Sequence, residues 1–503
     1  MTLARAWSVA LYGVDGRLVE IESDIGAGLP GVHLVGLPDA SLHESKDRVR
    51  AAVVNSGRNW PNRRITLALS PATLPKAGSG FDLALACAVL AACGGVAQRE
   101  LDGTVLIGEL ALDGRLRPVR GVLPSLLAAR RCGARRVVIP TSTLPEAALV
   151  EGLEVFGAAR LNDVLGWLAG DRELTRPGEL VAAPAESPPD LADVVGQKDG
   201  RLALEVAAAG GHHLMLVGPP GTGKTMLAQR LAGLLPELGA EEALQLAAIR
   251  SVAGRLPVSG PLSLAAPFVA PHHSSSVAAL VGGGSGLARP GAVSLAHRGV
   301  LFMDEAPEFG PHLLESLRTP LEEGEVRLAR ADGSVRYPAR FQLVLAANPC
   351  PCAPAHNRDC LCPPNARRRY LGRLSGPLLD RVDLRAELHP VVALSGDELE
   401  PGESTATVRA RVLAARAAAA SRWSEHGWRT NAEVPGPALR ARFRLPQAVV
   451  QPLEDGLLQG QLTARGADRA LKLAWTLCDL AGGDRPDREM VKTAIKFKEQ
   501  RAE

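Results

Sequence analysis

A short glycine-rich stretch in the middle of the chain carries the residue types needed to hold a phosphate group. Residues 218–225 read Gly-Pro-Pro-Gly-Thr-Gly-Lys-Thr, which fits the pattern G-x-x-x-x-G-K-T. The glycines let the backbone curl tightly, so that its N–H groups turn inward toward phosphate oxygens. Lys224 is long enough to reach the outer phosphates, and the Thr225 hydroxyl is suited to bind Mg²⁺. The stretch predicts a nucleotide site made of Gly218, Pro219, Pro220, Gly221, Thr222, Gly223, Lys224 and Thr225.

The residues around this stretch predict the elements that position it. Leu214 to Val217 form a short apolar run, as expected of a strand buried on both faces of a parallel sheet. Residues 226–235 can form a helix whose positive N-terminal end faces the bound anion. A chance match in a glycine-rich chain is the alternative, but the strand–loop–helix order argues against it. The sequence therefore predicts an ATP-binding α/β domain.

Two further apolar runs end in polar residues that suit phosphate chemistry. Residues 299–303 form a strand-like run followed by Asp304 and Glu305, and residues 342–347 form another followed by Asn348. A carboxylate at such a strand end can hold Mg²⁺ and its water shell, which assigns Asp304 to the metal. Glu305 is then placed to polarise the attacking water. The alternative is a strand capped by solvent-exposed acids.

Four cysteines stand close together directly after Asn348. Cys350, Cys352, Cys360 and Cys362 supply four thiolates within a short loop, a soft ligand set that suits tetrahedral Zn²⁺. The C-x-C spacing is tighter than the usual C-x₂-C, and disulfides or an iron–sulfur cluster are the alternatives. We expect a structural zinc site that braces the ATPase centre. The other cysteines are scattered and are expected to be buried apolar residues: Cys87, Cys93, Cys132 and Cys478.

The composition limits the class of protein. The chain has 503 residues, of which 46% are hydrophobic, enough for about three domains. A net charge of +3 does not by itself indicate nucleic-acid binding. The 3% aromatic content argues against a base-stacking surface. No charged segment followed by a long apolar run opens the chain, and no apolar stretch is long enough to span a bilayer. We therefore expect a cytoplasmic protein with no membrane partner.

Breaks in composition divide the chain into four parts. Residues 1–175 alternate short strands and helices, including a strand expected over residues 105–110, and predict a mixed α/β domain. Residues 176–189 are rich in proline and predict a linker. Residues 190–395 hold the nucleotide motifs, and residues 396–503 predict a small helical lid.

Residues beyond the phosphate loop resemble the AAA+ ATPases. Residues 190–197 are similar to the segment that lies near the adenine in that class, and Asn348 stands where a polar residue helps to position the attacking water. A hairpin expected over residues 325–340, with Asp332-Gly333 at its turn, is typical of the group that contains the magnesium chelatases, the MCM helicases and RuvB. The Ser-Gly-Pro-Leu-Leu-Asp-Arg run ending at Arg381 implies an arginine that reaches the ATP of a neighbouring subunit. This resemblance implies a ring, and we expect a homo-hexamer.

For several arginines the sequence leaves two roles open. In the AAA+ class the helical lid supplies an arginine to the γ-phosphate, and the resemblance gives this role first to Arg469 and second to Arg465, with a surface position as the alternative for either. For Arg381 the alternative is a salt bridge with Asp380 or Asp383 within its own subunit. The expected hairpin carries arginines that either track DNA phosphates or belong to a solvated charged surface, and these are Arg327, Arg330 and Arg336.

The resemblance narrows to one family and covers nearly the whole chain. The sequence resembles the ComM/YifB family of magnesium-chelatase-like AAA+ ATPases. This resemblance implies a hexameric motor that hydrolyses ATP with Mg²⁺ and drives branch migration of DNA in natural transformation and recombination. The alternative is an ATPase of the magnesium-chelatase type that remodels a protein partner, and a non-catalytic assembly role is a further one. The motifs that carry the resemblance lie at residues 35–39, 271–274, 281–284, 289–291, 294–297 and 348–352.

The N-terminal part resembles the Lon-type protease domain over residues 75–80 and 108–119. Active Lon proteases use a Ser–Lys dyad, in which the lysine activates the serine. Gly80 stands at the position of that serine and Leu123 at that of the lysine, while Ser79 is adjacent but has no lysine partner. We therefore expect a non-proteolytic domain used for assembly or binding, with an ATP-dependent protease as a distant alternative. The predicted fold class is α/β: a P-loop AAA+ core with an N-terminal Lon-protease-like α/β domain and a C-terminal helical lid.

Overall fold

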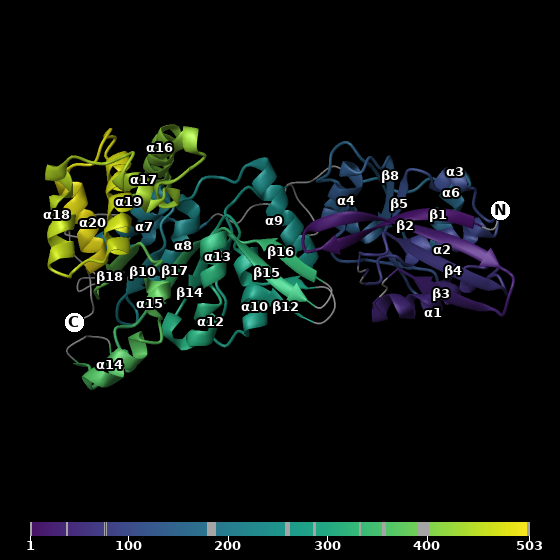
Figure 1. The fold of residues 1–503 in the computed structure, drawn as a ribbon, viewed down its shortest axis with the longest axis horizontal. Helices are drawn as coiled ribbons and strands as arrows, with labels where there is room; N and C mark the ends of the chain where they lie inside the picture. The colour runs from purple at the N-terminus through teal and green to yellow at the C-terminus, as the bar shows by residue number, and fades with distance from the viewer. Residues whose placement is uncertain are drawn as a thin grey trace.

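The computed structural model describes residues 3–36, 39–74, 76, 78–178, 188–256, 262–284, 288–330, 333–354, 359–390 and 402–499. Most of the predicted linker at 176–189, the predicted boundary at residue 396 and Asp332 at the predicted hairpin turn lie outside these residues. The described parts form an elongated molecule, with the N-terminal half at one end, the nucleotide motifs in the middle and the C-terminal helices at the other end (Figure 1).

The N-terminal half is built on a seven-stranded sheet with the strand order β3-β4-β2-β1-β5-β8-β9. Strands β1 and β2 form a long antiparallel ladder, and β5, β8 and β9 continue the sheet as parallel strands. Helix α2 lies against β1 and β2 and is buried along its whole length, since Ala, Leu, Val and Cys make up almost all of it. The elements are β1 (Leu3–Tyr12), β2 (Asp15–Gly26), β3 (Gly31–Val35), α1 (Ala40–Asn55), β4 (Arg64–Ser70), α2 (Asp82–Ala92), α3 (Gln98–Leu101), β5 (Thr104–Leu106), β6 (Glu109–Leu110), β7 (Leu116–Arg117), α4 (Val122–Arg131), β8 (Arg136–Pro140), α5 (Leu144–Ala147), β9 (Glu154–Ala158) and α6 (Leu161–Leu168).

The single strand predicted over residues 105–110 is wrong in part. Strand β5 ends at Leu106, and the following β6 pairs with β7 in a separate two-stranded sheet. The break falls at Gly108, whose N–H donates to the Gly80 carbonyl at 3.0 Å instead of to a neighbouring strand. A hydrogen bond to a residue so far along the chain leaves no local trace in the hydrophobic pattern.

The middle of the molecule holds a five-stranded parallel sheet with the order β11-β14-β17-β10-β18. Every residue of β10, β14 and β17 is buried, as expected of central strands covered on both faces, and the predicted strands 214–217 and 342–347 are confirmed. Because these strands are parallel, their carboxyl ends lie along one edge of the sheet. The elements are α7 (Lys198–Gly210), β10 (Leu214–Val217), α8 (Lys224–Leu234), α9 (Ala240–Ala253), β11 (Phe268–Val269), α10 (Val277–Val281), β12 (Gly282–Gly283), β13 (Arg289–Pro290), α11 (Ala292–Leu295), β14 (Val300–Met303), α12 (Pro311–Glu315), α13 (Arg318–Glu323), β15 (Glu325–Arg330), β16 (Gly333–Pro338), β17 (Gln342–Ala347), α14 (Pro364–Leu371), α15 (Gly376–Leu379) and β18 (Leu384–Glu387).

The C-terminal region is helical, as predicted, and packs on the side of the nucleotide domain formed by α7 and α8. Its apolar residues share one core with the sheet, in which the fully buried Trp423 contacts Trp475 edge to face at 5.5 Å between ring centroids. No helix in the part of the chain that the structure describes is both long and apolar enough to cross a membrane. The helices are α16 (Thr405–Trp423), α17 (Gly436–Arg440), α18 (Gln447–Leu458), α19 (Ala464–Leu480) and α20 (Arg488–Glu499).

Candidate functional site

The loop between β10 and α8 has the shape that phosphate binding needs. Gly221 and Gly223 have left-handed backbone with φ of +77° and +84°, a conformation that glycine adopts without strain. A Cβ atom at Gly221 would meet nothing within 4 Å, so the backbone there lines open space. Lys224 is only 9% exposed, and its Nζ donates to the carbonyls of Gly218 at 2.7 Å and Pro219 at 2.8 Å. The lysine ammonium is therefore held against the loop that would surround the phosphates.

Asp304 and Glu305 follow β14 and lie beside this loop. Thr225 Oγ1 donates to Asp304 Oδ2 at 2.7 Å, which brings together two oxygen atoms of the kind that Mg²⁺ prefers. Glu305 has a φ of +51°, which a residue other than glycine rarely adopts, and its side chain is 52% exposed. Burial lowers the pKa of Lys224, while the negative charges of Asp304 and Glu305 act in the opposite direction. These residues thus form one electrostatic unit in which a buried cation faces two acids.

Asn348 completes the cluster. Its Oδ1 accepts a hydrogen bond from Lys224 Nζ at 3.1 Å. Strand β17, which ends just before Asn348, lies between β10 and β14, so its carboxyl end falls between the phosphate loop and the acids. The structure therefore brings together the residues predicted from three separate strand ends: Lys224, Thr225, Asp304, Glu305 and Asn348.

Sequence reasoning missed one neighbour of this cluster. His273 Nδ1 lies 3.9 Å from Glu305 Oε2, and the His273 ring contacts the His272 ring at 4.1 Å between the ring centroids, tilted by 34°. The signal in the sequence was the Pro-His-His-Ser run at 271–274, which we used only as a family motif. Its place next to Glu305 depends on the fold, because the two residues lie on separate segments of the chain.

The predicted arginines Arg381 and Arg469 lie at the opposite edge of the sheet from the phosphate loop. The N–H of Asp383 donates to the carbonyl of His213, which immediately precedes β10, whereas the loop follows β10. Four residues of strand separate these ends by about 13 Å. Arg469 Nη1 lies 2.6 Å from Asp383 Oδ1, so Arg469 does not join the cluster around Lys224.

Each of the three candidate arginines, Arg381, Arg465 and Arg469, has an acidic partner within the same subunit. Arg381 forms an ion pair with Glu322, and its Nη1 donates to the Pro377 carbonyl at 2.5 Å. The alternative candidate Arg465 forms a more exposed pair with Asp380, at 3.7 Å. Arg381 therefore pairs within the chain, although with Glu322 on α13 and not with Asp380 or Asp383, the two partners considered in the alternative.

Asp383 is the buried centre of this edge. Burial of its carboxyl opposes ionisation, but the interaction with His212 and the charge of Arg469 outweigh burial and lower its pKa below the usual range. Its Oδ2 also accepts the His213 N–H at 3.2 Å. The lid helix α19, which carries Arg469, is thereby tied to the start of β18.

The hairpin of β15 and β16 separates apolar and basic residues onto its two faces. Val326 and Tyr337 are paired across the strands and buried, whereas Arg327 and Arg336 are paired at the next position and exposed. Arg327 contacts Glu323 at 3.1 Å and Glu325 at 2.5 Å, which leaves its side chain 50% exposed. The predicted hairpin is confirmed, and two of its arginines face solvent side by side. The side chain of Arg330 and the turn residue Asp332 lie outside the described residues.

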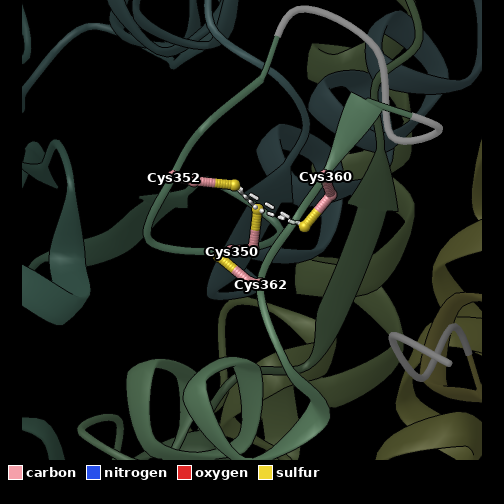
Figure 2. Close-up of side chains that lie close together, drawn as sticks. All are labelled: Cys350, Cys352, Cys360 and Cys362. Atoms are coloured by element: carbon pink, nitrogen blue, oxygen red, sulfur yellow. Dashed lines mark hydrogen bonds between the residues drawn. The ribbon is translucent and has the colours of Figure 1, made fainter.

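The four clustered cysteines lie close enough to share one metal ion, as Figure 2 shows. The Sγ atom of Cys350 lies 3.3 Å from those of Cys352 and Cys360, and all four sulfur atoms lie within 4.8 Å of one another. Tetrahedral zinc with Zn–S bonds of 2.3 Å requires sulfur atoms about 3.8 Å apart. Four unbridged thiols at this spacing fit a zinc ion, and no disulfide links them in the structure.

The scattered cysteines follow our expectation only in part. Cys87 and Cys478 are buried, but Cys93 and Cys132 are exposed. Both exposed cysteines are C-cap residues, of α2 and α4, so each stands where its buried helix reaches the surface. The apolar composition of α2 gave no sign of exposure at its end, whereas Arg130 and Arg131 in the last turn of α4 could have indicated it.

The region that resembles Lon places no lysine on its serine. Ser79 Oγ bonds the Glu109 carboxylate, and Leu123, which stands at the position of the lysine, is fully buried. Lys76 is buried as well, and its Nζ donates to three backbone carbonyls, among them those of Gly36 and Leu69 at 2.9 Å each. These contacts leave Lys76 engaged with the backbone and Ser79 with an acid.

Family models and individual proteins both match this chain. The model of magnesium chelatase subunit ChlI matches residues 190–395, a model of subunit ChlI of Mg-chelatase matches residues 21–143, and that of the ChlI C-terminal part matches residues 402–498. The uncharacterized protein Rv2897c of Mycobacterium tuberculosis is 61% identical, over 99% of both chains. YifB of Escherichia coli is 42% identical over 99% of this chain and 97% of its own length.

A competence protein is among the relatives. ComM of Haemophilus influenzae is 42% identical over 96% of this chain and 94% of its own length. A shorter similarity, 31% identity over 172 residues, extends to the Lon protease of Salinispora arenicola and covers 22% of that protein. The fold is accordingly α/β, with a magnesium-chelatase-type AAA+ core, a Lon-like similarity and a C-terminal helical region. Together with the cluster around Lys224, these matches show that the chain belongs to the ComM/YifB family of magnesium-chelatase-like AAA+ ATPases.

Proposed function

We propose that this protein is a ring-forming ATPase that moves branched DNA. Membership of the family implies ATP hydrolysis, and the convergence of Lys224, Thr225, Asp304, Glu305 and Asn348 at one sheet edge is the observation that carries the assignment of the site. The domain limits predicted from the sequence, 1–175, 176–189, 190–395 and 396–503, remain part of this proposal.

Each residue of the cluster has a chemical task in this proposal. Lys224 and the N–H groups of residues 218–225 bind the phosphates, and Thr225 and Asp304 hold Mg²⁺ and its water shell. The metal supplies charge neutralisation on the phosphate oxygens. Glu305 accepts a proton from the attacking water, and Asn348 orients that water. The short distance between Lys224 and Asn348 supports these roles, because both side chains must reach the terminal phosphate.

The position of the arginines supports a ring. Arg381 and Arg469 belong to the edge of the sheet where β10 begins, and the phosphate loop belongs to the edge where β10 ends, about 13 Å or one strand length away. We therefore assign these arginines to the ATP of an adjacent copy, where they would stabilise transition-state charge. We propose a homo-hexamer in which this edge of one subunit faces the phosphate loop of the next.

The proposed DNA contact lies on the exposed face of the β15–β16 hairpin. Arg327 and Arg336 stand opposite each other on neighbouring strands, and Glu323 and Glu325 already balance the charge of Arg327, so we assign the phosphate contact to Arg336 first. Phosphate groups of DNA supply the negative charge for this contact. The printed name of the H. influenzae relative, a competence protein, supports a task in DNA uptake and recombination, such as branch migration in natural transformation.

The cysteine cluster is proposed to hold structural zinc. Cys350 directly follows the strand end that carries Asn348, so a metal-fixed loop would hold Asn348 in place. Zinc in a four-thiolate site has no open position and takes no part in hydrolysis.

A four-way DNA junction with labelled arms tests the proposed function. The wild-type protein with ATP is expected to convert the junction into forked duplexes, and Glu305→Gln is expected to convert none while still binding ATP. Arg336→Ala should slow conversion, and Arg58→Ala, which removes an exposed arginine of the N-terminal half, should not. A protein that hydrolyses ATP but leaves every junction intact would favour the alternative, remodelling of a protein partner.

A further inference from the structure

Within the described residues, the N-terminal domain contacts the nucleotide domain at α9 and also at the β15–β16 hairpin. In Figure 1 the blue helix α4 lies beside α9, and the purple turn between β1 and β2 reaches the green hairpin near β16. Neither contact involves the cluster around Lys224. Together they connect the hairpin to α9 through the N-terminal domain.

The first contact fixes the N-terminal domain on α9 through buried polar groups. Ser251 on α9 donates from its Oγ to Glu146 Oε2 at 2.5 Å, and the same carboxylate oxygen accepts the Leu123 N–H at 2.9 Å. The Gly121 N–H donates to the Ser251 carbonyl at 3.2 Å. Ala247, one turn earlier on α9, is buried within the apolar core of the N-terminal domain. A shared core with satisfied polar groups makes this a fixed contact and not a loose one.

The second contact seats the β1–β2 turn directly on the hairpin backbone. Gly13 in this turn has a φ of +66°, and a Cβ atom there would lie 2.4 Å from the Arg336 carbonyl oxygen and 3.1 Å from Val335 Cγ1. Only glycine fits this approach, because real Cβ atoms do not come so close to an oxygen. Leu11 and Val14, on either side, pack against the apolar core that also receives Val335.

The hairpin depends on such packing because it forms a sheet of only two strands. An isolated two-stranded hairpin is marginally stable in water and needs an apolar surface to rest on. The nucleotide domain supplies this surface at the base, where the Tyr337 hydroxyl donates to the Ala288 carbonyl at 2.5 Å. The turn around Gly13 covers the backbone of β16 further along and leaves the exposed Arg327 and Arg336 uncovered.

We infer that the N-terminal domain serves as a brace: anchored on α9, it holds the β15–β16 hairpin so that the hairpin moves only together with that domain. This role needs no peptidase chemistry, which agrees with the engagement of Ser79 and Lys76 in other contacts. The bracing itself rests on protein contacts alone, whereas its consequence for DNA rests on the proposed function.

Hydrogen exchange of the full-length protein, without DNA or nucleotide, tests the brace. Gly13→Ala forces the turn away from Arg336, and the amide hydrogens of β15 and of residues 333–337 in β16 should then exchange about tenfold faster or more. Gly133→Ala is the matched control, because Gly133 is in the same domain at a φ of +77° with nothing within 4 Å of its Cβ position. Both variants therefore carry the backbone strain, but only the first displaces the hairpin. Equal protection of the hairpin in the two variants would overturn the inference.

A milder variant and a second measurement distinguish failure of the brace from failure of the proposed function. Val14→Ala removes packing of the turn on the apolar core that it shares with the hairpin, without backbone strain, and should raise hairpin exchange even if Gly13→Ala does not fold. DNA-stimulated ATP hydrolysis should fall in Gly13→Ala and Val14→Ala, while the unstimulated rate stays at the Gly133→Ala level. Faster hairpin exchange together with no DNA response in any protein, wild type included, would support the brace and contradict the proposed function. Unchanged exchange in both turn variants would contradict the brace, whatever DNA does.

Discussion

Replacement of Arg469 by alanine should destabilise the protein much more than the same change at Arg465. Arg469 Nη1 lies 2.6 Å from the Asp383 carboxylate, and the two side chains are 19% and 8% exposed. Removal of one partner of a buried ion pair costs about 3–5 kcal/mol, because the remaining charge stays buried. Asp383 keeps its bond from the His213 N–H, so we expect a loss of about 3 kcal/mol.

The Arg465 pair provides the contrast. Arg465 is 76% exposed and its partner Asp380 is 49% exposed, at a separation of 3.7 Å. Exposed pairs of this kind contribute about 0–1 kcal/mol. Urea unfolding of both variants, followed by tryptophan fluorescence, measures the difference, since Trp475 is on the same helix as Arg469. Equal free energies of unfolding in the two variants would refute the view that the buried ion pair of Arg469 stabilises the packing of α19.

The cysteine cluster, two buried histidines and Arg381 each give a further prediction. Cys352→Ser should lower bound zinc from about one ion per chain to near zero, whereas Cys93→Ser should not; equal zinc contents by mass spectrometry would count against the site. Burial lowers the pKa of His213 to about 4 and that of His297 to about 3, so both stay neutral in the native state while unfolded histidines take up protons below about pH 6.5. Their contribution to stability is therefore present above that pH and lost as the pH falls, and a free energy of unfolding that stays constant between about pH 7 and about pH 5 would contradict this. Arg381→Ala should reduce ATP hydrolysis by about 10³-fold and leave nucleotide binding intact, and an unchanged rate would exclude a role in a neighbouring active site.

The nucleotide cluster was predictable because its members occupy strand ends. Lys224, Asp304 and Asn348 each follow a short apolar run, and a parallel sheet brings such ends to one edge. The spacing within each motif, together with this rule, is enough to predict their meeting. The cysteine cluster was predictable for a similar reason, since its four residues lie within one short loop.

Contacts between distant segments were not predictable from the sequence. Asp383 and Arg469 are 86 residues apart, and neither the aspartate nor the arginine has a local feature that identifies the other as its partner. The contact of Gly13 with Arg336 joins residues of two different domains, and the glycine is one of 52 in the chain. Such pairs depend on how whole domains dock, which hydrophobic periodicity does not encode.

ATP hydrolysis in the presence of different DNAs tests the central claim most directly. The purified protein would be assayed without DNA and with single-stranded, duplex and four-way-junction DNA, alongside Glu305→Gln and Arg336→Ala. We predict that DNA stimulates hydrolysis, that Glu305→Gln abolishes it, and that Arg336→Ala retains the unstimulated rate but responds less to DNA. Hydrolysis that is indifferent to every DNA would contradict the account and point to a protein partner instead.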